Sequence, residues 1–338
     1  MTSFSKVIVW GYPLDTHTHS YIHYGWVKAF KSLGYDTYWF NDENYPSINE
    51  FDYTNSLFIT EGYADRQIPL HPSNIYLVHV AVHPKKYLDS GARFIDLRYN
   101  VKGIKDCNYV YQLEGKTLEE IHPTMLYEAN ATDRDLNPRF RHHSPLTYEA
   151  IYIAWATDLL PSEINFEDRF IEPESPPVTY FIGSMGGGNI RDIQTFADAC
   201  VHKGIRVIHI DPWRNPVSFK DAQEFVQRSA VCPDIRGSGD PDKIRMGETG
   251  TCHKEIGYIP CRLFKNISYG KLGMTNCPRL KELFGDLVIL ETNEAKMVET
   301  YLEKSKDKDY ILKQMEWVKD HHTYIRRVQD LLKIVSKK

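Results

Sequence analysis

Short apolar runs alternate with amphipathic segments along the N-terminal half of the chain. Residues 6–10 form a nearly continuous apolar run, as expected for a buried parallel strand. Trp26, Val27, Phe30 and Leu33 then recur at helical spacing, and Gly34 is expected to end that helix. Further strands are expected at 37–40, 56–60, 74–82, 93–97, 109–113 and 151–155. This alternation predicts a doubly wound α/β domain.

The pattern is interrupted at residues 159–177, which are rich in proline and acidic side chains. Such a stretch is typical of a linker. A second α/β series follows, with strands expected at 178–182, 205–210, 272–275 and 287–290. Helices are expected over 190–203, from Ser218 to 228, and over 260–269, where Gly270 closes the last one. We therefore predict two Rossmann-like halves, 1–158 and 178–306, joined by the linker.

One long helix is predicted over 307–338. Apolar residues recur there at spacings of three and four, with one gap at His322, and cationic side chains lie opposite them. A basic amphipathic helix of this kind is compatible with peripheral contact to an anionic membrane surface. The favoured interpretation is that its apolar stripe docks on the protein's own domains.

Composition narrows the classes of function. The 338 residues carry a net charge of −4, which argues against a surface that tracks nucleic acid. The 22 tyrosines suit either stacking on sugars and bases or the filling of cores. The six cysteines form no Cys-x-x-Cys pair or zinc pattern, so no metal is expected. No leader and no apolar run of about 20 residues is evident, and we expect a cytoplasmic protein without a transmembrane segment.

The segment 254–276 holds the most informative chemistry. Pro260 fits the first position of a helix, and a helix N-terminus attracts anions. Arg262 and Lys265 lie three residues apart near that start, whereas Phe264 and Ile267 are expected to face the core. Two cations there suit a nucleotide diphosphate, with the preceding Tyr258 and Ile259 placed to pack on the base. The alternative is a surface helix with solvated charges.

The run RLFKNISYGKLGMTN (262–276) resembles the R-L-F-E-A-x-A-x-G-x-x-x-x-T/S segment of GT-B glycosyltransferases, and most closely that of the CgeB-like, spore-maturation group. LKELF (280–284), HTYIRRVQDLL (322–332) and Gly183-Ser184 after a strand agree with that group. The resemblance covers about residues 178–335.

The resemblance implies the GT-B fold: two Rossmann-like domains facing a cleft, with a C-terminal helix across them. It implies transfer of a sugar from a UDP- or GDP-type nucleotide-diphosphate sugar to a hydroxyl of a glycan or other acceptor, without metal or cofactor. Residues 1–158 would be the acceptor side and 178–306 the nucleotide-sugar side, where the glycine-rich turn would lie near the donor. That turn comprises Gly183, Ser184, Gly186, Gly187 and Gly188.

One departure from the family pattern concerns the ribose. Retaining GT-B enzymes commonly carry two glutamates eight positions apart in this region, and this chain has Gly257 and Lys265 at the matching positions. The candidates for binding the ribose are then Asn266, Ser268 and Glu255. The inverting or retaining outcome stays undecided, with a lean towards inversion.

An inverting enzyme needs a general base for the acceptor hydroxyl, and histidine suits that role near neutral pH. His17 and His19 follow the first strand, in the loop that faces the ligand crevice of an open α/β sheet. We predict one of them as the base, with Asp15 as its orienting partner. Several inverting GT-B enzymes resemble this chain in that loop. Glu61, His79 and His83, after other strands, are further candidates.

Two alternatives remain open at this point. A sugar-nucleotide epimerase on the same fold would convert a donor with no acceptor present. A non-catalytic module would bind nucleotide sugar or glycan without turnover.

Overall fold

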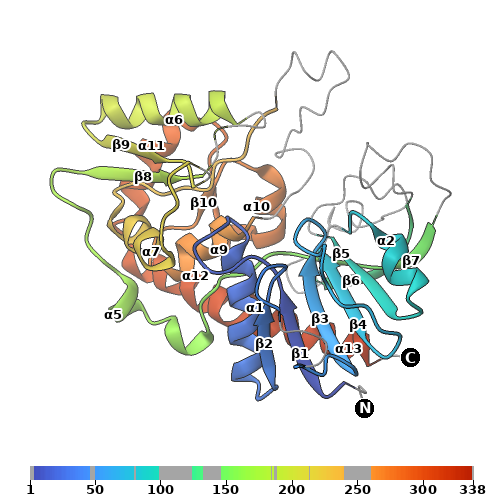
Figure 1. Cartoon of the computed structure of the whole chain (residues 1–338). Helices are drawn as coiled ribbons and strands as arrows, with labels where there is room; N and C mark the ends of the chain where they lie inside the picture. The colour runs from blue at the N-terminus through green and yellow to red at the C-terminus, as the bar shows by residue number, and fades with distance from the viewer. Residues whose placement is uncertain are drawn as a thin grey trace. The chain divides into compact units, whose positions relative to one another are not determined.

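The computed structural model describes residues 4–45, 50–79, 81–98, 124–131, 146–183, 185, 189–212, 214–239 and 260–336, whose elements are labelled in Figure 1. The chain divides into two compact units. Among the described residues, the first unit holds 4–158 and 324–336, and the second holds 159–323. The predicted strand at 109–113 lies outside the described residues.

The first unit is built on a seven-stranded sheet with the order β2-β1-β3-β4-β5-β7-β6. All neighbours run parallel except β6, which pairs antiparallel with β7. The predicted α/β class with a parallel sheet is confirmed, and β6 is an addition to it. The strands are β1 (Lys6–Trp10), β2 (Thr37–Phe40), β3 (Ser56–Glu61), β4 (Ile75–His79), β5 (Arg93–Arg98), β6 (Thr124–Ala131) and β7 (Leu146–Ile153).

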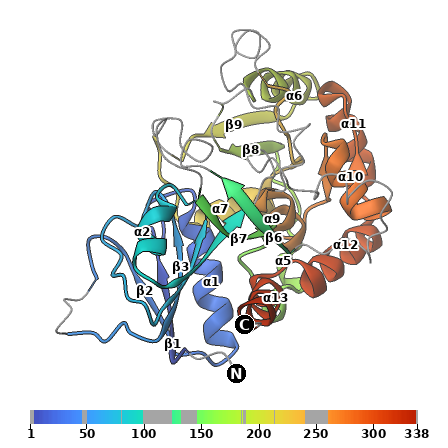
Figure 2. The ribbon, with the colours of Figure 1, turned by 90° about the vertical axis from the view of Figure 1, so that its right-hand side faces the viewer.

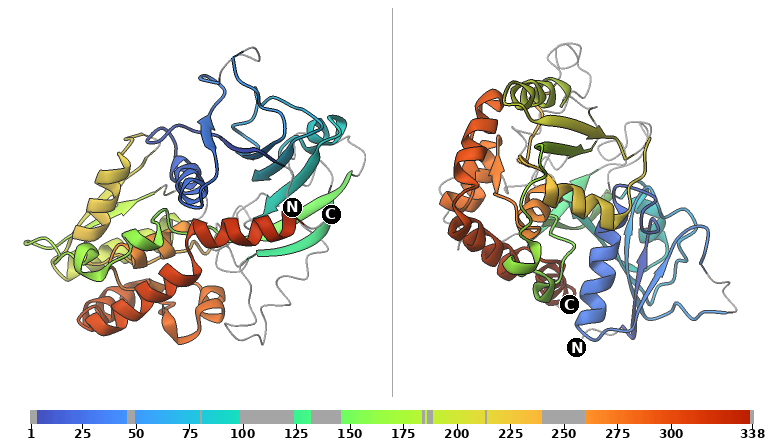
Figure 3. Two further views of the ribbon diagram at one scale, coloured as in Figure 1. Left: turned by 90° about the horizontal axis from the view of Figure 1, so that it is seen from below. Right: turned by 90° about the vertical axis from the view of Figure 1, so that its left-hand side faces the viewer.

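Two helices of the first unit pack against each other beside the sheet. Helix α1 (Ser20–Ser32) contacts β1 and β2, and α13 (Tyr324–Val335) contacts α1 and β6 (Figure 3). The apolar stripe of α1 is buried as predicted, with Trp26 and Phe30 inaccessible to solvent. Gly34 ends the helix with φ +83°, a conformation that glycine adopts without strain. The helix α2 (Pro84–Asp89) contacts β5.

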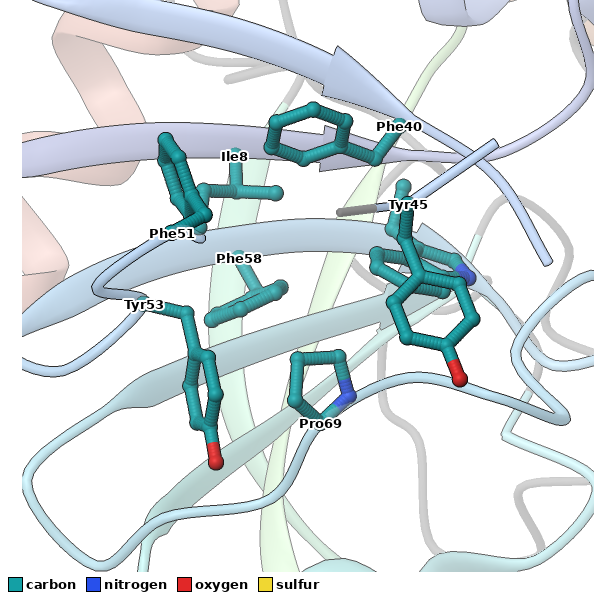
Figure 4. Close-up of a pocket in the computed structure, with 8 residues that line it drawn as sticks. Ile8, Phe40, Tyr45, Phe51, Tyr53, Phe58 and Pro69 are labelled. Atoms are coloured by element: carbon teal, nitrogen blue, oxygen red, sulfur yellow. The ribbon is translucent and has the colours of Figure 1, made fainter. Parts of the chain in front are cut away.

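An aromatic cluster that includes Phe58 and Tyr76 covers the other face of the sheet. Side chains from the β2–β3 connection, among them Tyr45 and Phe51, close a small apolar cavity there (Figure 4). Its volume is about 20 Å³, which is room for about one water molecule. This cavity is therefore a packing feature of the core and not a ligand site.

The second unit contains two parallel strand pairs linked by an extended segment. Strand β8 (Val178–Ile182) pairs with β9 (Arg206–Ile210), and β10 (Met274–Thr275) with β11 (Ile289–Leu290). The segment 230–236 runs between the pairs, since Ala230 N–H donates to the Val178 carbonyl and Asp234 N–H to the Met274 carbonyl. The result is a Rossmann-like arrangement.

Helices surround these strands, and α6 packs against α11 (Figure 2). Ser218 caps α7 as predicted, because its Oγ accepts the N–H of Asp221 at 3.1 Å. The helical elements of this unit are η1 (Pro161–Glu163), α5 (Phe166–Arg169), α6 (Ile190–His202), α7 (Phe219–Arg228), α9 (Cys261–Ser268), α10 (Pro278–Phe284), η2 (Gly285–Leu287), α11 (Glu294–Lys304) and α12 (Lys308–His321).

The prediction of one C-terminal helix over 307–338 is wrong. The chain forms α12 and then α13, with a break at His322 and Thr323. His322 leaves the helical conformation (φ −130°, ψ 39°), and its ring packs on Phe264 and Phe284 at centroid distances of 4.6 and 5.1 Å. Burial of this ring accounts for the gap in the helical pattern. The two helices belong to different units, α12 to the second and α13 to the first.

The helix that carries Arg262 begins one residue later than expected. Pro260 is its N-cap with extended backbone (φ −81°, ψ 159°), and Cys261 is the first helical residue. Phe264 and Ile267 are buried, as predicted. No helix within the described part of the chain has the length and apolar character needed to cross a bilayer.

Candidate active site

Histidine and glutamate meet at the carboxyl edge of the sheet in the first unit. Glu61 ends β3, and His19 lies in the loop between β1 and α1. The carboxyl ends of parallel strands share one edge of a sheet, which brings these residues together. His19 Nδ1 lies 2.7 Å from Glu61 Oε2. Glu61 is only 5% exposed, so the hydrogen bond fixes the imidazole against a buried carboxylate.

Glu61 is held in its ionised form by its neighbours. Burial raises the pKa of this carboxyl, but the hydrogen bond from His19 and the charges of His19, His23 and His17 outweigh it and lower the pKa overall. An ionised carboxylate only accepts hydrogen bonds, so His19 donates its Nδ1 proton. The lone pair of a neutral His19 ring is then on Nε2, where it is able to accept a proton.

His23 lies behind this pair. Its Nε2 is 3.8 Å from Glu61 Oε2, and the ring is 1% exposed. Burial, partly offset by Glu61, lowers the pKa of His23 to about 4. The ring packs on the backbone of Gly11, where an added Cβ would lie 2.1 Å from the imidazole. Glycine at position 11 is therefore what admits the His23 ring.

His17 has a different environment from His19. The backbone N–H of His19 donates to His17 Nδ1 at 3.0 Å, so the proton of a neutral His17 ring is on Nε2. Burial, with the nearby charge of His19, lowers the pKa of His17 to about 4. The ring stacks on Tyr12 with centroids 3.8 Å apart. Of the two predicted bases, this geometry favours His19.

Asp15 does not supply the carboxylate that His19 uses. It is exposed, with φ +68°, and His19 donates its hydrogen bond to Glu61 instead. His19 and Glu61 are 42 positions apart in the sequence, so their pairing depends on the tertiary fold. The sequence signal was the position of Glu61 at the end of a predicted strand.

His79 and Trp155 complete the edge. His79 pairs with Glu61 in the strand register, is buried, and packs on Trp155 at a centroid distance of 4.5 Å. Burial, with the charges of His23 and His19, lowers its pKa well below the ordinary value. His83 is exposed at the start of α2. His79 therefore belongs to one cluster with Glu61, His19 and His23, which we call the histidine–glutamate cluster.

In the second unit, Arg262 lies at the carboxyl end of β8. Its Nη2 donates to the Ile182 carbonyl at 2.7 Å, and its Cζ lies 4.6 Å from the centre of the Phe181 ring. A Cβ at Gly183 would lie 2.4 Å from Nη2, so glycine there leaves space for the guanidinium. Burial and the positive charge of Arg236 lower the pKa of Arg262.

Arg236 is a cation that the sequence reasoning missed. It is buried, and its guanidinium is hydrogen-bonded to Asp234. Asn276 fixes its backbone by accepting Arg236 N–H at 2.7 Å and donating to the Arg236 carbonyl at 3.0 Å. An Asp-Ile-Arg triplet before a glycine was the available signal, but only the fold places it near Arg262.

The other predicted residues of this unit are placed as follows. Lys265 lies over the ring of Tyr269, 5.8 Å from its centre. Asn266 is buried and donates to the Cys232 carbonyl at 2.8 Å, so its amide links two parts of the interior. Ser184, Gly186, Gly187, Gly188, Glu255, Tyr258 and Ile259 lie outside the described residues.

Across the described ranges, no three His, Cys, Asp or Glu side chains are grouped to hold a metal ion. No protein-family model matches the sequence, and no curated protein matches it.

Solved structures with a similar fold include the following transferases and a synthase. The spinosyn forosaminyltransferase SpnP has 11% identity over 98% of this chain and 100% of its own, with a TM-score of 0.41. T4 phage BGT in complex with its UDP-glucose substrate has 9% identity over 98% and 100%, with a TM-score of 0.47. The α,α-trehalose 6-phosphate synthase of Burkholderia multivorans has 8% identity over 98% and 97%, with a TM-score of 0.46.

Proposed function

We propose that this protein is a glycosyltransferase of the GT-B type that moves a sugar from a nucleotide-diphosphate sugar to an acceptor hydroxyl. The observation that carries the proposal is the hydrogen bond of 2.7 Å between His19 and the buried Glu61. A histidine oriented by an ionised carboxylate is a general base, and it lies at the edge where open α/β sheets bind ligands. The sequence resemblance to the CgeB-like group supports the same function.

In the proposed reaction, His19 Nε2 accepts the proton of the acceptor hydroxyl. The hydroxyl oxygen forms a bond to the anomeric carbon of the donor sugar, and the bond from that carbon to the nucleotide diphosphate breaks. Glu61 stabilises the imidazolium that forms. Attack by a base-activated acceptor in one step inverts the anomeric carbon, so we propose an inverting enzyme.

The leaving nucleotide diphosphate acquires negative charge as the bond breaks. We assign its stabilisation to Arg262, assisted by Arg236. Arginine presents a planar fork of donors to phosphate oxygens, and positive charge at the leaving group stabilises the transition state. In this assignment the protein itself supplies the charge, and UDP- and GDP-sugars are the donors to test first.

The test begins with thermal-shift screening of the purified chain against UDP-, GDP-, dTDP- and CMP-sugars, because a bound donor raises the melting temperature. Transfer is then measured with the donor that binds and a panel of hydroxyl acceptors. We expect His19→Ala to lower kcat by about 10²- to 10⁴-fold, and Glu61→Gln to lower it in the same direction. The matched control is His17→Asn, whose kcat should stay within about tenfold of the wild-type kcat because the Asn side chain also accepts the His19 N–H.

Full turnover in both His19→Ala and Glu61→Gln would exclude the proposed base. Donor conversion with no acceptor present would identify an epimerase instead. Tight donor binding with no turnover on any acceptor would identify a binding module.

A further inference from the structure

A cavity of about 540 Å³ lies beside the loop between β1 and α1, which carries His17 and His19. Its wall includes His17, Tyr12, Tyr63, Asn41, Glu43 and Arg66. The volume falls in the range of cavities that bind small molecules, about 300–1,000 Å³. Because His17 belongs to the same loop as His19, a molecule in this cavity would lie next to the proposed base.

The cavity wall carries one exposed cation and one exposed anion that do not neutralise each other. Within the described part of the chain, neither Arg66 nor Glu43 forms an ion pair. Asp42 also lines the cavity and keeps its negative charge, but its carboxylate oxygens already accept the Trp10 indole N–H at 2.9 Å and the backbone N–H groups of Arg66 and Gln67 at 3.1 and 3.0 Å. The wall therefore offers both a strong donor and a strong acceptor of hydrogen bonds.

Aromatic rings form another part of the wall. Tyr63 is 59% exposed, so its ring is accessible to a ligand at this cavity. Tyr12 lies beneath the His17 ring in a stack with an interplanar angle of 18°. Flat apolar faces combined with polar edges suit a ligand that has both apolar C–H faces and many hydroxyl groups.

We propose that this cavity binds the acceptor as a neutral, hydroxyl-rich sugar, with Tyr63 against its C–H face and Arg66 and Glu43 on its hydroxyls. This inference rests on the proposed function for the role of the ligand as acceptor. A neutral hydroxyl both donates and accepts, so it satisfies Glu43 and Arg66 together. With a guanidinium and a carboxylate on the same wall, a uronate or an amino sugar meets one attraction and one repulsion, whereas a neutral sugar forms hydrogen bonds with both groups.

The test measures binding to the full chain by ligand-observed NMR titration, without any donor. The probes are glucose, galactose and mannose, with glucuronate, galacturonate, glucosamine and galactosamine as charged counterparts. We expect at least one neutral sugar to bind more tightly than its own charged counterparts. Tyr63→Ala should weaken that binding about tenfold, or about 1.4 kcal/mol, whereas Tyr63→Phe should retain most of it.

Charge variants should act in opposite directions. Arg66→Gln should favour the amino sugar over the uronate, and Glu43→Gln should favour the uronate. Tyr45→Ala, which removes an exposed ring outside this cavity, is the control and should leave binding unchanged.

The proposal is overturned if no neutral sugar binds, if a charged counterpart binds more tightly, or if Tyr63→Ala has no effect. Failure of the proposed function looks different. In that case the sugar binds with dependence on Tyr63, but no donor supports transfer. Conversely, transfer with an acceptor KM unaffected by Tyr63→Ala and Arg66→Gln would refute this inference and leave the proposed function intact.

Discussion

The ring of His23 occupies space that every side chain other than glycine would fill at position 11. It is enclosed with Glu61, His19 and His17, and burial keeps it neutral, with a pKa of about 4. His17 is shifted in the same direction, also to about 4. At the scale of single residues, the site therefore keeps the His23 and His17 rings neutral, while Glu61 stays ionised and accepts the hydrogen bond of His19.

This exclusion makes stability depend on pH. The unfolded chain protonates His23 near its ordinary pKa of 6.5, whereas the folded state does so only near 4. The contribution of His23 to the free energy of unfolding is therefore fully present above pH 6.5 and is lost as the pH drops towards 4. At about 1.4 kcal/mol per pKa unit, the loss from this one group is roughly 3 kcal/mol. Urea unfolding at pH 7 and pH 4.5 should show His23→Gln losing less stability than the wild type.

The exposed His202→Gln serves as the control for that comparison and should follow the wild type. Equal losses in the wild type and His23→Gln would mean that His23 is not the group responsible.

At the scale of elements, strand and helix starts were predictable where the cause is local. The strands at 6–10, 37–40 and 178–182 match β1, β2 and β8, because an apolar run defines a buried parallel strand by itself. The break between α12 and α13 was not predictable, since it depends on the packing of His322 against Phe264. The loop of His19 was predictable, because it directly follows an apolar strand. Glu61 as the partner of His19, and Arg236 beside Arg262, depend on contacts between distant residues and required the tertiary fold.

The contact between α1 and α13 depends on one glycine. A Cβ at Gly25 would lie 2.3 Å from the Tyr324 ring, and that ring also packs on Trp26 at 4.8 Å. Alanine favours a helix over glycine by about 1 kcal/mol, but overpacking a filled interface costs about 1–3 kcal/mol. We expect Gly25→Ala to be net destabilising, measured as the free energy of unfolding in urea.

Lys31→Ala, on the exposed side of α1, provides the reference for helix propensity alone. A Gly25→Ala variant as stable as Lys31→Ala would show that the two helices adjust without cost.

At the scale of the whole molecule, the first unit is assembled from separate parts of the sequence. Arg327 on α13 is fully buried and donates to the carbonyls of Ala154 and Trp155 at 2.9 and 3.1 Å. It thereby fastens the chain that leaves β7, including the Trp155 ring beside His79. The carbonyls become unsatisfied if the donor is removed, a loss of about 1–3 kcal/mol for each buried group.

Arg327→Met should therefore lower the free energy of unfolding by about 2–4 kcal/mol. The neighbouring Arg326→Met is the matched control. Arg326 is half-exposed and pairs with the buried Asp330 at 3.5 Å, and Lys333 still pairs with that carboxylate at 3.3 Å when Arg326 is removed, so the expected loss is smaller, about 1 kcal/mol. Chemical unfolding of both variants checks the difference. Equal effects would indicate that the two carbonyls find other partners.

The return of α13 to the first unit has a consequence for biosynthesis. A ribosome makes the sheet of this unit long before it makes residues 324–336, and the whole of the second unit is translated in between. The histidine–glutamate cluster therefore cannot reach its final packing until α13 has been synthesised, even though every residue of the cluster has already left the ribosome. Folding of the second unit can proceed first, so the part of the protein that is translated first is completed last.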